Sequence, residues 1–405
     1  MRYCPSILKR FYGGSTSIPN SSNFEALLTD AALVSDEELE RMKAMVRAKD
    51  PDMMLFTSGS SGRPKGVVQT HFARVNNARF QAQALSADHN DRFCCALPLF
   101  HCFSLSAVVL PALAVGACVC FPENHHTISV LHTIERYRCT VLMGVPTMFS
   151  AILARPDLDG YDLRSLRIGL IAGSSYPPTL FEKIVQRLKF ALLPALGMTE
   201  ATAGITCGAQ SDSMYVRTHS VGKFLPYVEG KICDIATGEA LPEGRKGELC
   251  IRGYCVMDGY YHNTELTRQV IDLEGWFHTG DLGYMDSEEN LYIIGRLKDL
   301  IIRGGENISP LEVESAIATD PRIECVKVVG VPDPHYIEEI CACVISKSPI
   351  TTEEIRRLVQ RQLARYKIPR YILFFSELPR TPSGKLDGRK IRTLALKSIA
   401  LESNA

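Results

Sequence analysis

The sequence predicts an α/β protein: a large domain with a parallel sheet and crossover helices, a small β-barrel-like subdomain, and a small α+β C-terminal domain. Three observations predict this class. Short apolar runs alternate with helical patterns through the first half, as in parallel strands joined by crossover helices. From about Gly222, short strand patterns are separated by turn clusters, which is typical of an antiparallel sheet or barrel. After Lys298, helical and strand patterns mix again.

Each region contributes its elements in chain order. In the first half we expect strands at 53–56, 93–97, 117–121, 140–143 and 167–171, and a helix at 178–188. In the β-rich part we expect strands at 230–234, 247–252 and 292–294. The last part is expected to hold helices at 310–318 and 352–363 and strands at 325–330 and 340–346. The domains are therefore placed at 1–215 (the α/β subdomain), 216–295 (the β-rich subdomain), 296–299 (a hinge) and 300–405 (the C-terminal domain).

Composition excludes several classes of protein. The 405 residues are 46% hydrophobic and 22% charged, so a disordered or fibrous chain is excluded. Lys+Arg and Asp+Glu both number 45, so no net charge attracts nucleic acid or an anionic membrane, and we expect neither partner. The chain begins without a signal-peptide pattern, which predicts a cytoplasmic protein.

The 14 cysteines include no C-x-x-C pair. Buried, reduced thiols are therefore a better interpretation than a zinc or disulfide framework. Cys118 and Cys120, like Cys341 and Cys343, alternate along a predicted strand and are expected to share one of its faces.

One uncharged stretch, residues 102–121, is long enough to cross a membrane. Pro111 and Gly116 interrupt it, and residues 117–121 form a separate strand pattern. We therefore expect a buried helix followed by a buried strand, and no transmembrane segment.

The strongest local signal is a Gly/Ser-rich loop that directly follows the apolar run 53–56. Its glycines let the backbone approach a ligand closely, and its hydroxyls, backbone N–H groups and one lysine suit phosphate oxygens. The Pro-Lys-Gly end of the loop argues against a flexible linker, and the absence of a Gly-Lys-Ser/Thr sequence excludes a Walker A loop. The predicted phosphate cradle consists of Thr57, Ser58, Gly59, Ser60, Ser61, Gly62 and Lys65.

Two downstream clusters place carboxylates where a nucleotide site would need them. Residues 197–200, Gly-Met-Thr-Glu, follow an apolar run, so Thr199 and Glu200 stand at a strand end, and Glu200 is a candidate Mg²⁺ ligand. Residues 276–281 end in Asp281, a carboxylate next to a glycine, which suits it to accept hydrogen bonds from a ribose diol.

Three more clusters complete the series. Residues 295–299 lie where the sequence pattern changes, so they are both a candidate phosphate or ribose contact and a candidate hinge. Residues 303–307, Arg-Gly-Gly-Glu-Asn, follow at once. Residues 379–385 form a proline-stiffened loop that ends in Lys385.

In this order and rough spacing, the clusters resemble those of the adenylate-forming superfamily of acyl-CoA synthetases, adenylation domains and luciferases, and most closely the fatty acyl-CoA and 4-coumarate-CoA ligase group. The resemblance runs from Asp52 to about Arg392. It implies a two-step reaction. A carboxylate attacks the α-phosphate of ATP to give an acyl-adenylate and pyrophosphate, and a thiol, usually that of coenzyme A, then displaces AMP. ATP, Mg²⁺ and coenzyme A are the implied cofactors.

The resemblance also implies a role for each matching residue. The cradle would hold the β and γ phosphates, Thr199 an adenylate phosphate oxygen and Glu200 the magnesium ion. Asp281 would hold the ribose hydroxyls, and Arg296 would contact ribose or phosphate. Gly173, Leu196 and Gly197 are the remaining nucleotide-binding positions.

The C-terminal domain is implied to move between the two steps. Lys385 would bridge the attacking carboxylate and the α-phosphate, where negative charge accumulates. Lys298 matches the hinge, and rotation there would withdraw Lys385 and present Gly304 and Gly305 to the incoming thiol.

The sequence departs from the family at two places. Leu196 stands where members usually carry an aromatic residue that stacks on adenine. Only about 50 residues precede the cradle, far fewer than in family members, so we expect the large domain to be N-terminally incomplete. An incomplete sheet exposes unpaired strand edges, which makes an oligomer possible.

The substrate class follows from residues 97–104. Amino-acid-activating members carry an aspartate next to the phenylalanine of this segment. This chain has His101 at that position, and the next carboxylate along the chain is Glu123. A buried, unpaired ammonium would be costly, so we expect a carboxylic acid with an apolar body. His101 is either a gate at the acyl slot or an ordinary core histidine, and the slot is expected to be lined by Phe100, Phe103, Val145 and Met148.

Three alternatives to an acyl-CoA ligase remain, and the first differs from it only in the carrier of the acceptor thiol. The chain is also compatible with loading of acyl groups onto the phosphopantetheine arm of a carrier protein. It is compatible with a truncated, catalytically impaired paralogue that only binds nucleotide or a partner chain. A P-loop kinase or ATPase is disfavoured because the Lys-Ser/Thr pair is absent.

Overall fold

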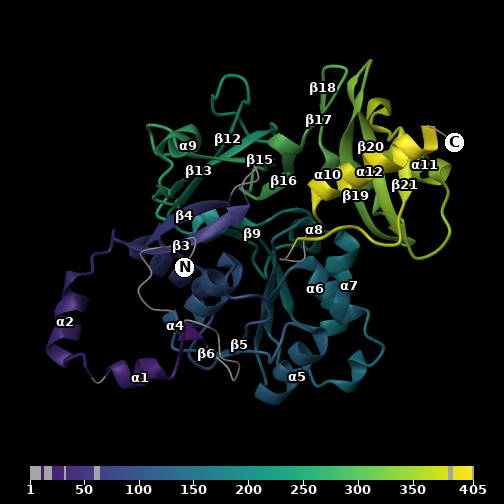
Figure 1. The fold of residues 1–405 in the computed structure, drawn as a ribbon. Helices are drawn as coiled ribbons and strands as arrows, with labels where there is room; N and C mark the ends of the chain where they lie inside the picture. The colour runs from purple at the N-terminus through teal and green to yellow at the C-terminus, as the bar shows by residue number, and fades with distance from the viewer. Residues whose placement is uncertain (1–10, 13–20, 32, 59–63, 382–385, 404–405) are drawn as a thin grey trace. The chain divides into compact units, whose positions relative to one another are not determined.

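The computed structural model describes residues 11–12, 21–31, 33–58, 64–381 and 386–403 (Figure 1). The chain divides into two compact units, Met1–Asp50 and Pro51–Ala405. In its described residues, the first unit has two short paired strands and two helices: β1 (Phe11–Tyr12), β2 (Ser22–Asn23), α1 (Ala26–Ala31) and α2 (Asp36–Met45). The Ser35 hydroxyl caps α2 by accepting a hydrogen bond from the backbone N–H of Glu38.

A seven-stranded sheet forms the α/β part of the second unit, in the order β11-β10-β9-β8-β7-β5-β6. Its strands are β5 (Arg92–Cys94), β6 (Cys118–Cys120), β7 (Val141–Gly144), β8 (Ile168–Ile171), β9 (Ala191–Met198), β10 (Ala203–Cys207) and β11 (Lys223–Phe224). β5 to β9 are parallel, as predicted. β10 pairs antiparallel with β9, because the short turn after β9 leaves no room for a crossover, and β11 pairs antiparallel with β10, so two antiparallel strands extend the parallel sheet.

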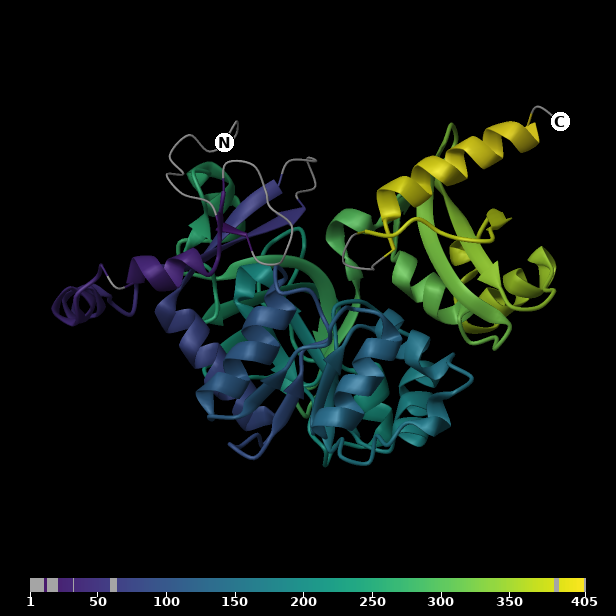
Figure 2. The same cartoon turned by 60° about the horizontal axis from the view of Figure 1, so that its bottom comes forward.

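Helices cover both faces of this sheet (Figure 2). One face is packed by α5 (Thr127–Tyr137), α6 (Pro146–Leu153) and α7 (Pro178–Leu188). On the other face lie α3 (His71–Ala84), the π-helical turn η1 (Phe103–Val109) and α4 (Leu110–Ala114). Residues 102–121 thus form helical turns followed by a strand, as expected, but the strand β6 is not fully buried as predicted, because it lies at the edge of its sheet. No helix among the described residues is long and apolar enough to span a membrane.

The strand predicted at 53–56 lies in a different sheet. β3 (Pro51–Ser58) pairs antiparallel with β4 (Pro64–Thr70), and β14 (Gly259–Tyr260) pairs with the other edge of β4. The placement in the parallel sheet was wrong, since the few residues between β3 and β4 allow a hairpin and not a crossover connection. The pairing of β14 with β4 brings together segments that are far apart in the sequence.

The β-rich part is an antiparallel sheet in the order β12-β13-β15-β16. Its strands are β12 (Val228–Cys233), β13 (Gly247–Gly253), β15 (Phe277–Met285) and β16 (Leu291–Arg296), and the helices nearby in sequence are α8 (Met214–His219) and α9 (Thr264–Val270). Ile232, Leu249, Ile251 and Phe277 are buried in one cluster on this sheet. The sheet was predicted, although β15, which begins one residue after Trp276, was not.

The C-terminal part packs helices on both faces of a five-stranded sheet. Its strands are β17 (Ile301–Arg303), β18 (Glu306–Ile308), β19 (Ile323–Asp333), β20 (Ile337–Ser346) and β21 (Tyr371–Phe374). α10 (Pro310–Ile317) and α11 (Thr352–Gln362) cover one face, and α12 (Gly388–Ser403) covers the other. Short 3-10 turns occur at η2 (Leu158–Gly160), η3 (Thr199–Ala201), η4 (Leu297–Asp299) and η5 (Arg365–Lys367). The domain boundaries at 215, 295 and 299 remain predictions.

The described cysteines are free thiols, and most are buried. Cys118 is exposed, which corrects the expectation of buried thiols at that position, because β6 is the edge strand of its sheet. Its sulfur lies 4.0 Å from that of Cys120, so the two share a strand face as expected.

Candidate active site

A cavity of about 1020 Å³ opens at the carboxyl ends of β8 and β9. Parallel sheets bind ligands at this edge because the loops that follow the strands converge there. The cavity is lined by many residues that the sequence singled out: Thr57, Lys65, His101, Gly173, Leu196, Gly197, Thr199, Glu200, Arg296 and Lys298. The tertiary structure therefore brings the separate clusters into one place.

Some predicted site residues lie elsewhere or cannot be placed. Gly304 and Gly305 form the turn between β17 and β18, with φ of +58° and +89°, and are not among the lining residues. Gly59, Ser60, Ser61, Gly62 and Lys385 lie outside the described residues, as does the side chain of Ser58. The roles assigned to these positions remain predictions.

A tyrosine that the sequence did not single out connects two predicted residues. The Tyr260 hydroxyl donates to Oε1 of Glu200 over 3.0 Å, and Nζ of Lys65 lies 4.8 Å from the centre of the Tyr260 ring. Burial raises the pKa of the Tyr260 phenol, and the Glu200 carboxylate adds to this, so the hydroxyl remains a donor. Tyr260 follows Gly259 on the two-residue strand β14, too short a segment for a periodic pattern to identify.

The turn that carries Thr199 and Glu200 is fixed from several sides. Gln69 is fully buried and donates to the backbone carbonyl of Thr199 over 2.8 Å. The backbone N–H of Met257 donates to the carbonyl of Glu200 over 2.9 Å, and the Thr199 hydroxyl donates to the sulfur of Cys102 over 3.4 Å. The positions of both side chains are thus set before a ligand binds.

Asp281 is a buried carboxylate, and one of its oxygens accepts no hydrogen bond from the described residues. It is 2% exposed and stands opposite Arg296 across β15 and β16, and Nε of Arg296 lies 2.6 Å from its Oδ1. Among the described residues, no group donates to Oδ2. Burial raises the pKa of Asp281, and the Arg296 guanidinium opposes part of that rise. A buried acceptor without a donor is costly, so this oxygen is suited to a ligand hydroxyl.

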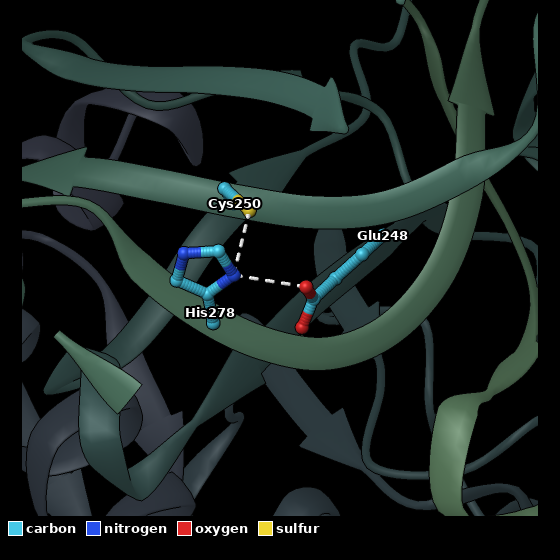
Figure 3. Close-up of side chains that lie close together, drawn as sticks. All are labelled: Glu248, Cys250 and His278. Atoms are coloured by element: carbon cyan, nitrogen blue, oxygen red, sulfur yellow. Dashed lines mark hydrogen bonds and ion pairs between the residues drawn. The ribbon is translucent and has the colours of Figure 1, made fainter. Parts of the chain in front are cut away.

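The turn before Asp281 is held by Glu248 and His278 (Figure 3). Oε1 of Glu248 accepts from the backbone N–H of Gly280 over 3.0 Å, and Oε2 lies 2.9 Å from Nδ1 of His278. The Thr279 hydroxyl donates to the carbonyl of Leu249 over 2.7 Å. These contacts tie the turn to β13, so the backbone of residues 278–281 is held in place.

His101 lines the cavity, and a backbone N–H two residues further along the chain orients its ring. The N–H of Phe103 donates to Nδ1 of His101 over 3.1 Å, which places the ring proton on Nε2 in the neutral form. Phe100 and Phe103 line the cavity as predicted. Val145 and Met148 do not, because both pack against the core clusters of the sheet, Met148 against both clusters and Val145 against one. Small apolar residues that the sequence did not identify line this part instead: Ala107, Ala172, Ala195 and Ala203.

A doubly covered α/β sheet, with a cavity at its strand ends lined by a threonine, a lysine and a glutamate, suits a nucleotide-binding enzyme. The buried Asp281 is not itself a lining residue, but its neighbour Gly280 and its ion-pair partner Arg296 are. The AMP-binding enzyme family model matches residues 14–261, and the AMP-binding enzyme C-terminal domain model matches residues 312–385. The chain belongs to the AMP-binding enzyme family, among its adenylate-forming acyl-CoA ligases.

Relatives and solved structures are similar over most of this chain. YngI of Bacillus subtilis (strain 168), a provisionally named acyl-CoA synthetase, is 38% identical over 99% of this chain and 73% of its own. The medium-chain acyl-CoA ligase ACSF2 of Danio rerio, named as mitochondrial, is 39% identical over 95% of this chain. This chain spans 64% of the Danio rerio protein, less than two thirds of its length.

Two solved structures share the fold. ATP-bound MatB from Rhodopseudomonas palustris superposes with a TM-score of 0.79 at 29% identity, covering 86% of this chain and 69% of its own. The o-succinylbenzoate CoA synthetase MenE of Bacillus subtilis, in complex with its acyl-adenylate intermediate, gives 0.76 at 32% identity, covering 86% and 70%. The predicted fold class and the resemblance are confirmed.

Proposed function

We propose that this chain activates a carboxylic acid with ATP, through an acyl-adenylate, and transfers the acyl group to the thiol of coenzyme A. The observation that carries the proposal is the buried Oδ2 of Asp281, which has no donor among the described residues. Gly280 and Arg296, the chain neighbour and the ion-pair partner of Asp281, line the same cavity as Thr199, Glu200 and Lys65. A ribose hydroxyl satisfies that oxygen, and the phosphates then extend toward the threonine and the lysine.

Each residue contributes a definite interaction to adenylate formation. Asp281 accepts from the ribose, and Arg296 holds its other oxygen, orients the carboxylate and opposes part of the rise in its pKa that burial causes. Lys65 supplies positive charge on the phosphate side, and its position over the Tyr260 ring limits its motion. The Thr199 hydroxyl donates to a phosphate oxygen in place of the sulfur of Cys102. Together they fix the α-phosphate for attack by the substrate carboxylate.

Magnesium fits this site. Tyr260 occupies one oxygen of Glu200, and within the described part of the chain no side chain donates to the other. A hard carboxylate oxygen beside ATP phosphates is the ligand set that Mg²⁺ prefers, and the ion neutralises charge on the phosphates. Glu200 is therefore its proposed ligand.

The acyl side of the cavity favours an acid with an apolar body, either fatty or aryl. Phe103, Ala107 and Leu170 line it, and in the sequence no Asp or Glu stands next to His101 to pair with a substrate ammonium group. His101 lines this cavity, and donation from its Nε2–H to the substrate carboxylate is its proposed role. The cytoplasmic location remains a prediction.

Carboxylate-dependent exchange of labelled pyrophosphate into ATP, over a panel of acids, tests the proposal. We expect exchange with a medium-length fatty acid or an arylacrylic acid and none with amino acids. Exchange driven best by an amino acid would overturn the substrate class, and no exchange with any acid would favour a chain that only binds nucleotide. Supplying coenzyme A or a phosphopantetheine-bearing carrier protein in a second assay identifies the acyl acceptor.

A further inference from the structure

Three metal-ligating side chains converge on one face of the β-rich sheet. Glu248 and Cys250 are two residues apart on β13, so their side chains leave the same face. His278 stands directly opposite Cys250 on β15. Two alternate residues on one strand and a third across the ladder form a compact set that the sheet itself holds in place (Figure 3).

The distances suit one small ion. Nδ1 of His278 lies 3.4 Å from Sγ of Cys250 and 2.9 Å from Oε2 of Glu248, and the three ligand atoms all lie within 4.8 Å of one another. Bond lengths of 2.0 to 2.3 Å in a tetrahedral zinc site place neighbouring ligand atoms roughly 3.3 to 3.6 Å apart. Shifts of about 1 Å or less would therefore bring all three atoms to bonding distance.

The surroundings already orient these ligands. Oε1 of Glu248 accepts from the N–H of Gly280, so Oε2 is the oxygen turned to the cluster. Behind the imidazole, Oδ2 of Asp272 lies 3.9 Å from Nε2 of His278, on the side where a carboxylate supports a metal-binding histidine. Glu248 and His278 both line the cavity, which gives an ion a route to the cluster. Three protein ligands leave the fourth position of a tetrahedral zinc site to water.

We propose that Glu248, Cys250 and His278 form a binding site for a divalent transition-metal ion, and that Zn²⁺ is the ion they select. A thiolate, an imidazole and a carboxylate favour zinc over magnesium or calcium, which prefer sets made only of oxygen. The thiolate and the carboxylate together balance the two positive charges, so the loaded site is neutral. On binding, the S–H bond of Cys250 breaks, a zinc–sulfur bond forms, and the proton leaves to solvent.

Hydrogen bonding alone is the competing account of the same three residues. In the absence of an ion, His278 bonds to Glu248, and burial raises the pKa of the Cys250 thiol so that it stays neutral. The two accounts differ in whether the sulfur binds a metal. The site is separate from the magnesium position proposed at Glu200 and does not depend on the proposed reaction.

Cobalt titration of the metal-stripped full chain tests the site, because Co²⁺ bound by a thiolate gives a sulfur-to-cobalt charge-transfer band. We expect one equivalent of Co²⁺ to produce this band and one equivalent of Zn²⁺ to abolish it. Cys250→Ser should remove the band and weaken zinc binding by at least about 10- to 100-fold, the loss that even an outer-sphere partner causes. Cys255→Ser is the matched control, since Cys255 is equally buried but lies outside the cluster, and it should keep both.

Several results would overturn the proposal. These are the absence of the band in the parent chain, its persistence in Cys250→Ser, and its loss in Cys255→Ser to the same extent. If Cys250→Ser does not fold, His278→Gln gives the same test at a partly exposed side chain. Zinc affinity unchanged in that variant would exclude the site.

Discussion

Replacing Asp281 by asparagine tests whether this residue binds the ribose, while the side-chain volume and the contact with Arg296 are kept. Asparagine keeps the volume of Asp281 and leaves a carbonyl oxygen for Nε of Arg296, which lies 2.6 Å from Oδ1. The amide then presents NH₂ where Oδ2 has no protein donor among the described residues. The variant therefore loses one charge-assisted hydrogen bond to a ribose hydroxyl, about 1.5 to 3 kcal/mol. That corresponds to roughly a 10- to 150-fold increase in KM for ATP.

The assay measures pyrophosphate exchange with ATP, 2′-deoxyATP and 3′-deoxyATP, in the parent and in Asp281→Asn. For the parent, removing the hydroxyl that Asp281 binds should raise KM by a similar factor. For the variant, removing that same hydroxyl should cost little, because the bond is already lost. If the substitution and the deoxynucleotides added their effects in full, Asp281 would not contact the ribose and the placement of the nucleotide would be wrong.

Stability gives the control for Asp281→Asn. The folded-state pKa of Asp281 is raised, so the contribution of this group to stability is present at low pH and is lost as the pH rises through its folded pKa. At pH 7 the buried carboxylate therefore costs stability, and asparagine removes that cost. We expect the Tm of the variant at pH 7 to equal or exceed that of the parent, so a lower affinity for ATP would not reflect unfolding.

Four further predictions address the hinge, the magnesium position and the core. Tyr260→Phe loses one hydrogen bond to Glu200, so the Mg²⁺ concentration that gives half-maximal stabilisation of the protein by MgATP should rise by about 3- to 10-fold. Tyr261→Phe, at the exposed neighbouring residue, is the control and should leave that concentration unchanged. Lys385→Ala should slow adenylate formation on the order of 100- to 1,000-fold and leave thioester formation from a preformed adenylate near the parent rate; equal slowing of both would refute a moving lysine. Lys298→Pro should do the reverse, because proline fixes φ in the hinge, and an unchanged thioester step would place the hinge elsewhere. Phe149→Ala, at a fully buried ring, should lower the free energy of unfolding by about 3 to 5 kcal/mol in urea titrations, and a loss below about 1 kcal/mol would contradict its place in the core.

Much of the site could be predicted because its residues follow strands. Thr199 and Glu200 come directly after the apolar run that forms β9, and Gly173 comes soon after β8. Neighbouring parallel strands end at one edge of a sheet, so residues that follow them must converge. His101 reaches the same cavity through the loop after β5.

Contacts between distant segments could not be predicted in the same way. Tyr260 contacts Lys65 and Glu200 only because β14 pairs with β4. A two-residue strand is too short for a periodic pattern that would indicate this pairing. The acyl region was assigned to Val145 and Met148 from their apolar character, yet apolar side chains fill the core and line cavities alike. Which of the two they do depends on packing.

The sequence by itself determined the fold class, the order of the clusters and the kind of chemistry each can perform, because strand and helix periodicity and the acid, base and hydroxyl groups are local properties of the chain. Only the tertiary structure decided that β3 and β4 form a hairpin outside the parallel sheet. It alone left Oδ2 of Asp281 buried without a described donor and brought Cys250 opposite His278. These features depend on strand register and on the exclusion of water by packed neighbours, which arise from interactions between segments far apart in the chain.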